Sequence, residues 1–122
     1  MNAAPAAPTA ALVATDLVIA GAVSGALATS GYAVVRLPPT LEPAGDAPAA
    51  EAAAPVCVVL DLDARDFDPL AVAERARARW PDARLVGIVQ HVHRDRIARG
   101  RARGLTIVPR SQLARLGSIL SR

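Results

Sequence analysis

The segment from Pro55 to Asp63, PVCVVLDLD, constrains the fold more than any other part of this sequence. Five apolar residues, Val56 to Leu60, run without interruption into an acidic residue, Asp61. A short β-branched run of this kind predicts a strand buried on both faces, as in the middle of a parallel sheet. Asp61 then lies at the carboxyl end of that strand, the edge at which open α/β sheets bind their ligands.

Segments with strand and helix patterns alternate along the rest of the chain. Apolar runs predict four further strands, at 10–15, 32–37, 84–89 and 105–108. Helical patterns, with Asp68 and Ser111 as N-caps of two of them, predict helices at 17–30, at 69–80, at 93–103 and after residue 111. This alternation predicts one α/β domain of the flavodoxin-like class, a five-stranded parallel sheet with helices on both faces.

Two segments rich in proline and alanine limit and interrupt this domain. Residues 1–9 are predicted to form a disordered tail, and the domain then extends over 10–122. Residues 38–55 are predicted to form a loop within the domain, with one weak helical turn around 49–54. The helix between the second and third strands is therefore expected to be reduced or absent.

The single cysteine, the absence of lysine and the uneven charge distribution limit the functions that this chain could have. The 122 residues include one cysteine, Cys57, within the central strand, which excludes a disulfide framework in this chain and favours a reducing compartment. Every basic side chain is an arginine, so chemistry that needs a lysine is excluded. Residues 1–68 hold two Arg against eight acidic residues, a net charge of −6, and residues 69–122 hold twelve Arg against three, a net charge of +9. Such an asymmetry indicates an interaction face for acidic partners.

Residues 17–35 are uncharged over 19 positions, which is close to the length of a membrane span. Six Gly, Ser and Thr residues lower the mean hydropathy of this segment, and no basic residue precedes it as in a signal peptide. We therefore expect a cytoplasmic protein without a membrane segment.

The order of these segments resembles the receiver domain of two-component response regulators over nearly the whole chain. Asp16 follows the first strand, Gly31 and Tyr32 precede the second, and Pro109 follows the fifth, as in receivers. Asp61, in the context VVLDL, stands where receivers carry the phosphoacceptor aspartate. The resemblance implies a CheY-like fold and a role in phosphorelay signal transduction, and it implies no enzyme.

The receiver positions for Mg²⁺ are only partly retained. Receivers hold this ion with two acidic residues beside the phosphoacceptor, because Mg²⁺ requires oxygen ligands in octahedral geometry. Thr15 stands where the acidic neighbour of Asp16 is usual, so the resemblance leaves Asp16 and Asp61 as the candidate metal ligands. No cofactor is required by this interpretation, and Mg²⁺ is the one that the resemblance allows.

The receiver switch positions also carry unusual residues. Val89 or Gln90 stands where receivers place a Thr or Ser at the end of the fourth strand. Val108, before Pro109, replaces the lysine that contacts the phosphoryl group, and an uncharged side chain does not offset phosphoryl charge. Gln90, Val108 and Pro109 are therefore switch positions of a degenerate receiver, or pseudo-receiver.

Three further acidic residues and two histidines follow the third and fourth predicted strands. Asp63, Asp66 and Asp68 are assigned turn and helix-start roles. His91 and His93 have the H-x-H spacing of some zinc sites, but only an aspartate is at hand to complete such a site, so they are interpreted as loop histidines.

The Arg-rich fourth helix is the candidate interaction surface. Arg96, Arg99 and Arg103 fall on one face of this helix, and Arg110 follows the fifth strand. In receivers this helix and strand form the output surface, so we expect a protein partner there, such as a histidine kinase or another signalling protein. Nucleic acid is the less favoured partner, and the lack of aromatic residues and of any DNA-binding motif on this face argues against stacking on single strands.

Three functional hypotheses remain. The first is a stand-alone pseudo-receiver, monomeric or homodimeric, that binds a protein without conventional phosphorylation. The second is a true receiver in which Asp61 accepts the phosphoryl group and Asp16 holds Mg²⁺. The third is a small binder of nucleic acid or an acidic ligand, which would show a steep salt dependence.

Overall fold

The computed structural model describes residues 7–42, 54–90 and 92–121. Strands and helices follow one another as β1 (Thr9–Val13), α1 (Leu17–Thr29), β2 (Ala33–Arg36), β3 (Cys57–Asp61), α2 (Pro69–Arg79), β4 (Arg84–Val89), α3 (Arg94–Ala102), β5 (Thr106–Pro109), the 3₁₀ helix η2 (Arg110–Arg115) and α4 (Leu116–Leu120). The predicted alternation is confirmed, and most element ends lie within one or two residues of the expected positions.

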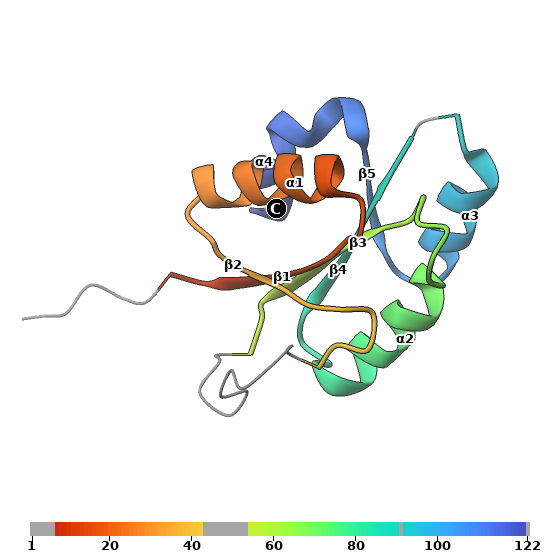
Figure 1. Cartoon of the computed structure of the whole chain (residues 1–122), viewed down its shortest axis with the longest axis horizontal. Coiled ribbons are helices and arrows are strands. Elements are labelled where there is room, and N and C mark those ends of the chain that lie inside the picture. The colour runs from red at the N-terminus through yellow and green to blue at the C-terminus, as the bar shows by residue number, and fades with distance from the viewer. Residues whose placement is uncertain (1–6, 43–53, 91, 122) are drawn as a thin grey trace, which may run out of the picture.

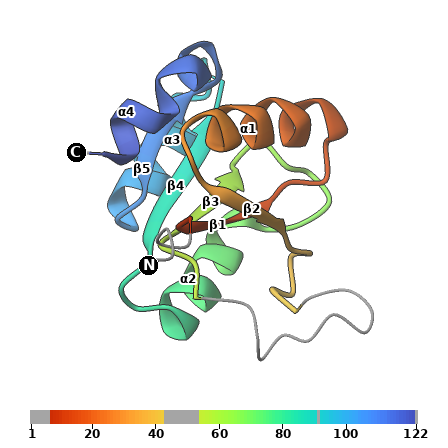
Figure 2. The same cartoon turned by 90° about the vertical axis from the view of Figure 1, so that its left-hand side faces the viewer.

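The five strands form one parallel sheet in the order β2-β1-β3-β4-β5, which confirms the predicted flavodoxin-like class. All five residues of β3 are buried between β1 and β4, as its unbroken apolar run predicts. Helices α1 and α4 cover one face of the sheet, and α2 and α3 cover the other (Figures 1 and 2). Because the strands are parallel, their carboxyl ends meet at one edge, with Asp61 on the central strand.

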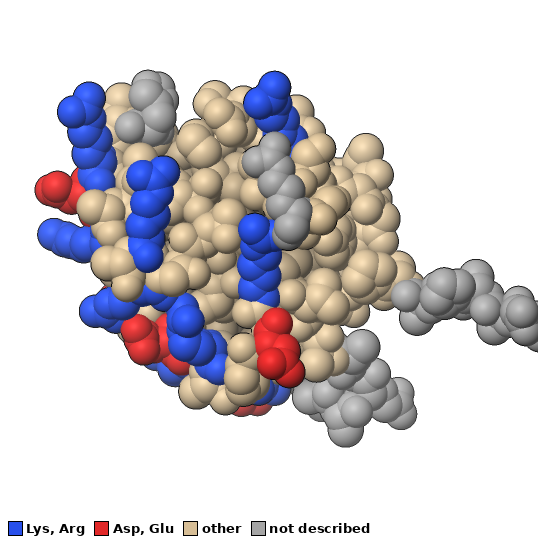
Figure 3. Space-filling view, turned by 180° about the vertical axis from the view of Figure 1, so that it is seen from behind, with Lys and Arg blue, Asp and Glu red and all other residues tan. Residues whose placement is uncertain are grey.

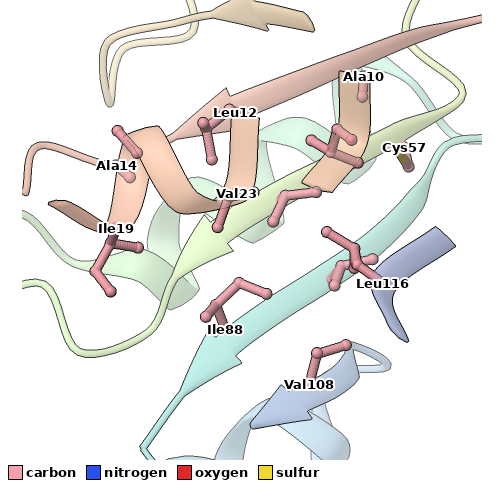
Figure 4. Close-up of a cluster of buried hydrophobic side chains, with 13 residues drawn as sticks. Ala10, Leu12, Ala14, Ile19, Val23, Cys57, Ile88, Val108 and Leu116 are labelled. Atoms are coloured by element: carbon pink, nitrogen blue, oxygen red, sulfur yellow. The ribbon is translucent and has the colours of Figure 1, made fainter. Parts of the chain in front are cut away.

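Alternating side chains of the strands build a separate apolar core on each face of the sheet. Cys57 and Val59 of β3 belong to the cluster beneath α1 and α4, where Val23 and Leu116 also pack (Figure 4). The second cluster receives one face of α2, with Leu70, Ala73 and Ala76, and also Trp80, which follows the helix. Both helical layers are therefore held by contacts with the same five strands.

Cys57 is buried in the first cluster, as its position in the central strand predicts. Burial raises the pKa of its thiol to about 11, although the charge of Arg84 acts in the opposite direction. The thiol therefore remains protonated at neutral pH and packs as a small apolar side chain.

Of the two predicted N-caps, Asp68 is confirmed and Ser111 is not. Asp68 Oδ1 accepts hydrogen bonds from the backbone N–H of Leu70 and Ala71 at the start of α2, as predicted. The prediction that Ser111 caps the last helix is wrong. The chain passes from Pro109 directly into η2, so Ser111 lies inside that 3₁₀ helix, and α4 starts only at Leu116.

The predicted loop between β2 and β3 is only partly described. Leu41 is 2% exposed and packs into the second cluster, and its carbonyl accepts a hydrogen bond from Arg79 Nη1. Residues 43–53, which include most of the predicted helical turn, lie outside the described part of the chain, as do residues 1–6 of the predicted tail.

The uncharged segment from 17 to 35 is divided between α1 and β2. No helix in the described part of the chain combines the length and apolar character that a membrane crossing requires.

Candidate functional site at the carboxyl edge of the sheet

Asp61, the last residue of β3, is the one polar residue among the described residues that is almost completely buried, with 3% exposure. Its Oδ1 accepts a hydrogen bond of 3.0 Å from the backbone N–H of Asp63. Burial raises the pKa of the Asp61 carboxyl, and the hydrogen bond and the charge of Arg110 only partly oppose this effect. The carboxylate of Asp61 is thus held in an environment that disfavours its charge.

Asp63, two residues beyond Asp61, is the centre of the polar network at this edge. Its Oδ1 lies 2.7 Å from His93 Nδ1 and 2.8 Å from Arg96 Nη1. Its Oδ2 accepts a 2.9 Å hydrogen bond from the backbone N–H of Gln90 and forms a 3.1 Å ion pair with Arg110 Nη2. One carboxylate therefore joins the ends of β3, β4 and β5 and the start of α3.

The charge state of Asp63 follows from these contacts. Burial of the carboxyl raises its pKa, but hydrogen bonds from His93, Arg96 and Gln90 and the charge of Arg110 outweigh burial. The net effect is a pKa below the ordinary value, so Asp63 is held as a carboxylate. Asp63 was predicted to have only a turn role. Its carboxylate also connects the turn after β3 to the ends of β4 and β5 and to the start of α3.

Arg110 reaches the site because β5 ends beside β3 and β4 at the same edge. Pro109 closes β5, and Arg110 is the first residue of η2. Its Nη2 lies 3.1 Å from Asp63 Oδ2 and 3.9 Å from Asp61 Oδ1. Its Nε is buried and has no hydrogen-bond partner among the described residues. The guanidinium therefore supplies a positive charge to both aspartates.

The three switch-position candidates have different surroundings. Gln90 lines the site and contributes its backbone N–H, while Val108 is fully buried in the cluster beneath α1 and α4. Pro109 is paired with Val89 at the end of β5. The side chain of Val108 is thus turned into the core, and Arg110 contributes the cation at this edge.

Asp16 and Thr15 are engaged in local hydrogen bonds. Asp16 Oδ1 accepts from the backbone N–H of Val18 and Ile19 and caps α1, and Thr15 Oγ1 donates to Asp66 Oδ1 at 2.7 Å. No group of three or more His, Cys, Asp or Glu side chains within the described ranges is arranged to hold a metal ion.

An open pocket of about 490 Å³ lies above these residues. Its lining includes both predicted metal ligands, Asp16 and Asp61, and the network residues Asp63, His93 and Arg96. Acidic side chains and cations thus meet in one small volume, where the cations offset the negative charge before any ligand binds.

Some of the remaining predicted residues lie apart from the pocket, some line it, and one is outside the described chain. Arg103 Nη1 forms a 2.8 Å ion pair with Glu74 of α2, and Arg99 is exposed on α3. Of the predicted H-x-H pair, His93 contacts Asp63, and His91 lies outside the described residues. Arg96 and Arg110, predicted as partner-binding residues, are turned toward Asp63.

The sequence interpretation did not identify Asp63 as the centre of the network. One signal was present, because Asp61 and Asp63 are two residues apart and parallel strands bring Gln90 and Arg110 to the same edge. The directions of the long Arg96 and Arg110 side chains, which both reach Asp63, do not follow from any local sequence pattern.

No protein-family model and no curated protein matches the chain. Among solved structures, NtrX from Brucella abortus is similar over 94% of this chain and 26% of its own, with 19% identity and a TM-score of 0.73. The phosphorylated cyanobacterial phytochrome response regulator RcpA matches over 94% of this chain and 89% of its own, with 18% identity and a TM-score of 0.70.

A third similar structure is nearly equal in length to this chain. A response regulator from Thermotoga maritima is covered over 99% of its length and covers 95% of this chain, with 20% identity and a TM-score of 0.69. By contrast, the chain spans about a quarter of the length of NtrX. The strand order, the acidic carboxyl edge and these similarities agree, and the chain has the CheY-like fold of response-regulator receiver domains.

Proposed function

We propose that this chain is a receiver-like signalling module that acts by binding a protein partner, without a conventional phosphorylation step. Its fold is that of proteins described as response regulators, which supports a signalling role. The chemistry of the carboxyl edge supports the second part of the proposal, because that edge is where a receiver would be phosphorylated.

The single observation that carries the proposal is the position of Arg110. Its guanidinium lies within 3.9 Å of Asp61 and within 3.1 Å of Asp63, so an internal cation already offsets the charge that Mg²⁺ would offset. A divalent cation entering this pocket would be repelled by Arg110 and would find Asp16 capping α1. Both features favour a site that maintains its conformation without metal or phosphoryl group.

We place the partner on the face formed by β5, η2 and α4. A pocket of about 570 Å³ lies on this face, and its lining includes Ile107, Gln112, Arg115 and Ile119. The lining combines apolar and hydrogen-bonding side chains, as the binding surfaces of protein partners do.

The competing hypothesis is a true receiver with Asp61 as phosphoacceptor, and phosphotransfer separates the two. The full chain is incubated with acetyl phosphate and Mg²⁺, and the intact mass is measured over time. We expect no phosphorylated species from the wild-type chain. Accumulation of a phosphorylated species that disappears in Asp61→Asn would overturn the proposal.

A variant provides the positive control for this assay. Thr15→Asp with Arg110→Ala introduces the second acidic residue and removes the internal cation. If this variant becomes phosphorylated at Asp61 while the wild-type chain does not, the donor and the conditions are competent.

A further inference from the structure

The outward side of α3 carries a cationic surface that the proposed signalling role does not use. Arg94, Arg99 and Arg101 are exposed, and no ion pair within the described residues involves them. Figure 3 shows arginine side chains projecting from the side of the molecule that α3 and the adjoining part of α2 form. The other two arginines of this segment, Arg96 and Arg103, are paired with acidic residues of the chain.

Helical geometry arranges these arginines in two rows. With about 100° between successive residues, Arg94 and Arg101 lie on one side of the exposed Ala98 and Ala102, and Arg99 lies on the other side with Arg103. Ala98 and Ala102 form a strip of small side chains along the middle. The helix backbone can therefore come close to a partner, with guanidinium groups extended on both sides.

We propose that this face of α3 binds the phosphate backbone of double-stranded nucleic acid without sequence specificity. The major groove of B-DNA, about 12 Å across, admits a helix of about this width, and its two walls present phosphates to the two rows of arginines. Arginine forms bidentate hydrogen bonds with phosphate and retains its charge at all physiological pH values.

Two features favour a duplex over other polyanions. The strip between the arginines contains no exposed large apolar side chain, whereas protein interfaces are anchored by such residues. The nearest one is Val92, which precedes α3. No aromatic residue lies in α3, so there is no platform on which single-stranded bases could stack.

Asp95 is the one acidic residue on this face. Its exposed carboxylate lies in the first turn of α3, next to the strip of alanines, and it would repel a phosphate backbone. Asp95→Asn is therefore expected to strengthen binding while the three arginine substitutions weaken it. A general loss of folding would weaken binding in every variant, so stronger binding by Asp95→Asn and weaker binding by the arginine variants would indicate a contact at α3.

The test is fluorescence anisotropy of a labelled random-sequence duplex titrated with the full chain between 50 and 200 mM salt. The triple variant Arg94→Gln, Arg99→Gln, Arg101→Gln is compared with a control of equal charge, Arg36→Gln, Arg75→Gln, Arg115→Gln. We expect micromolar binding at about 50 mM salt, and the slope of log K against log salt should fall by about 3 in the α3 variant. The control should bind within threefold of wild type.

Three results would overturn the inference. The first is that the wild-type chain binds no duplex at the lowest salt, and the second is that the control triple variant loses as much affinity as the α3 variant. The third is that polyglutamate displaces the labelled duplex as well as unlabelled duplex does at an equal concentration of negative charge, which would make an acidic protein the partner. None of these outcomes depends on whether Asp61 is phosphorylated, so the inference is tested apart from the proposed function.

Discussion

Arg110 Nη2 and Asp63 Oδ2 form a 3.1 Å ion pair that joins the end of β5 to the turn after β3. The Asp63 side chain is 6% exposed and that of Arg110 is 28% exposed, so the pair is largely shielded from solvent. This pair places a positive charge permanently beside Asp61. Several measurable consequences follow from the unequal surroundings of the two aspartates.

Asp63→Asn is expected to lower the free energy of unfolding at pH 7 by about 2–3 kcal/mol, because Arg110 and Arg96 lose their shared carboxylate. The lowered pKa of Asp63 stabilises the fold at pH values above the unfolded-state pKa of about 3.9, and this contribution is lost as the pH falls through the folded-state pKa. Urea titrations at pH 7 and pH 3 measure the difference. Exposed Asp82→Asn is the control and should change stability by less than about 0.5 kcal/mol.

Asp61→Asn is expected to raise the free energy of unfolding at pH 7 by about 1 kcal/mol, since Asn keeps the acceptor for Asp63 N–H without a charge to desolvate. The raised pKa of Asp61 makes its neutral form the stabilising one. That contribution is present below about pH 3.9 and is lost as the pH rises through the folded-state pKa. Thermal denaturation at pH 7 and pH 3 should therefore show a gain that shrinks in acid. A loss of stability at pH 7 would mean that Arg110 and the Asp63 N–H compensate the Asp61 charge fully, and not in part.

A double-mutant cycle distinguishes the two contacts of Arg110. Arg110→Met combined with Asp63→Asn should give a coupling energy of about 1–3 kcal/mol, because the two groups lie at ion-pair distance and are largely buried. The same change combined with Asp61→Asn should give a smaller coupling energy, since 3.9 Å separates that pair. Equal coupling energies would show that Arg110 serves both carboxylates alike.

Gly87→Ala is expected to destabilise the protein by about 1–3 kcal/mol, because a Cβ there would lie 2.5 Å from Leu62 Cδ1 in the second core cluster. Gly25→Ala on the outer face of α1 is the matched control. No atom lies within 4 Å of its Cβ position, so alanine should stabilise the helix by up to about 1 kcal/mol. Chemical denaturation of both variants tests the packing of β4 against the turn after β3. Equal effects would contradict that packing.

The fold could be predicted because its signals are local. The apolar run ending at Asp61 and the cap formed by Asp68 each depend on a few neighbouring residues. The start of the last helix was predicted incorrectly because Ser111 has the identity of a cap, whereas Pro109 and Arg110 already direct the chain into η2.

The site was only partly predictable, since it depends on contacts between residues far apart in the sequence. Sequence position assigned Asp61 to the sheet edge, and Asp61 lies there. The ion pair between Arg110 and Asp63 spans 47 positions, and it depends on the conformation of a long side chain that no local pattern specifies.

The most direct test of the central claim is an NMR titration of backbone amide shifts with Mg²⁺ and beryllofluoride, an acyl-phosphate mimic. If Arg110 and the incomplete set of acidic residues prevent conventional phosphorylation, no shifts should cluster at Asp16, Asp61 and Gln90 at millimolar Mg²⁺. Shifts that cluster at those three residues and vanish in Asp61→Ala would contradict this account and identify a working phosphoacceptor site.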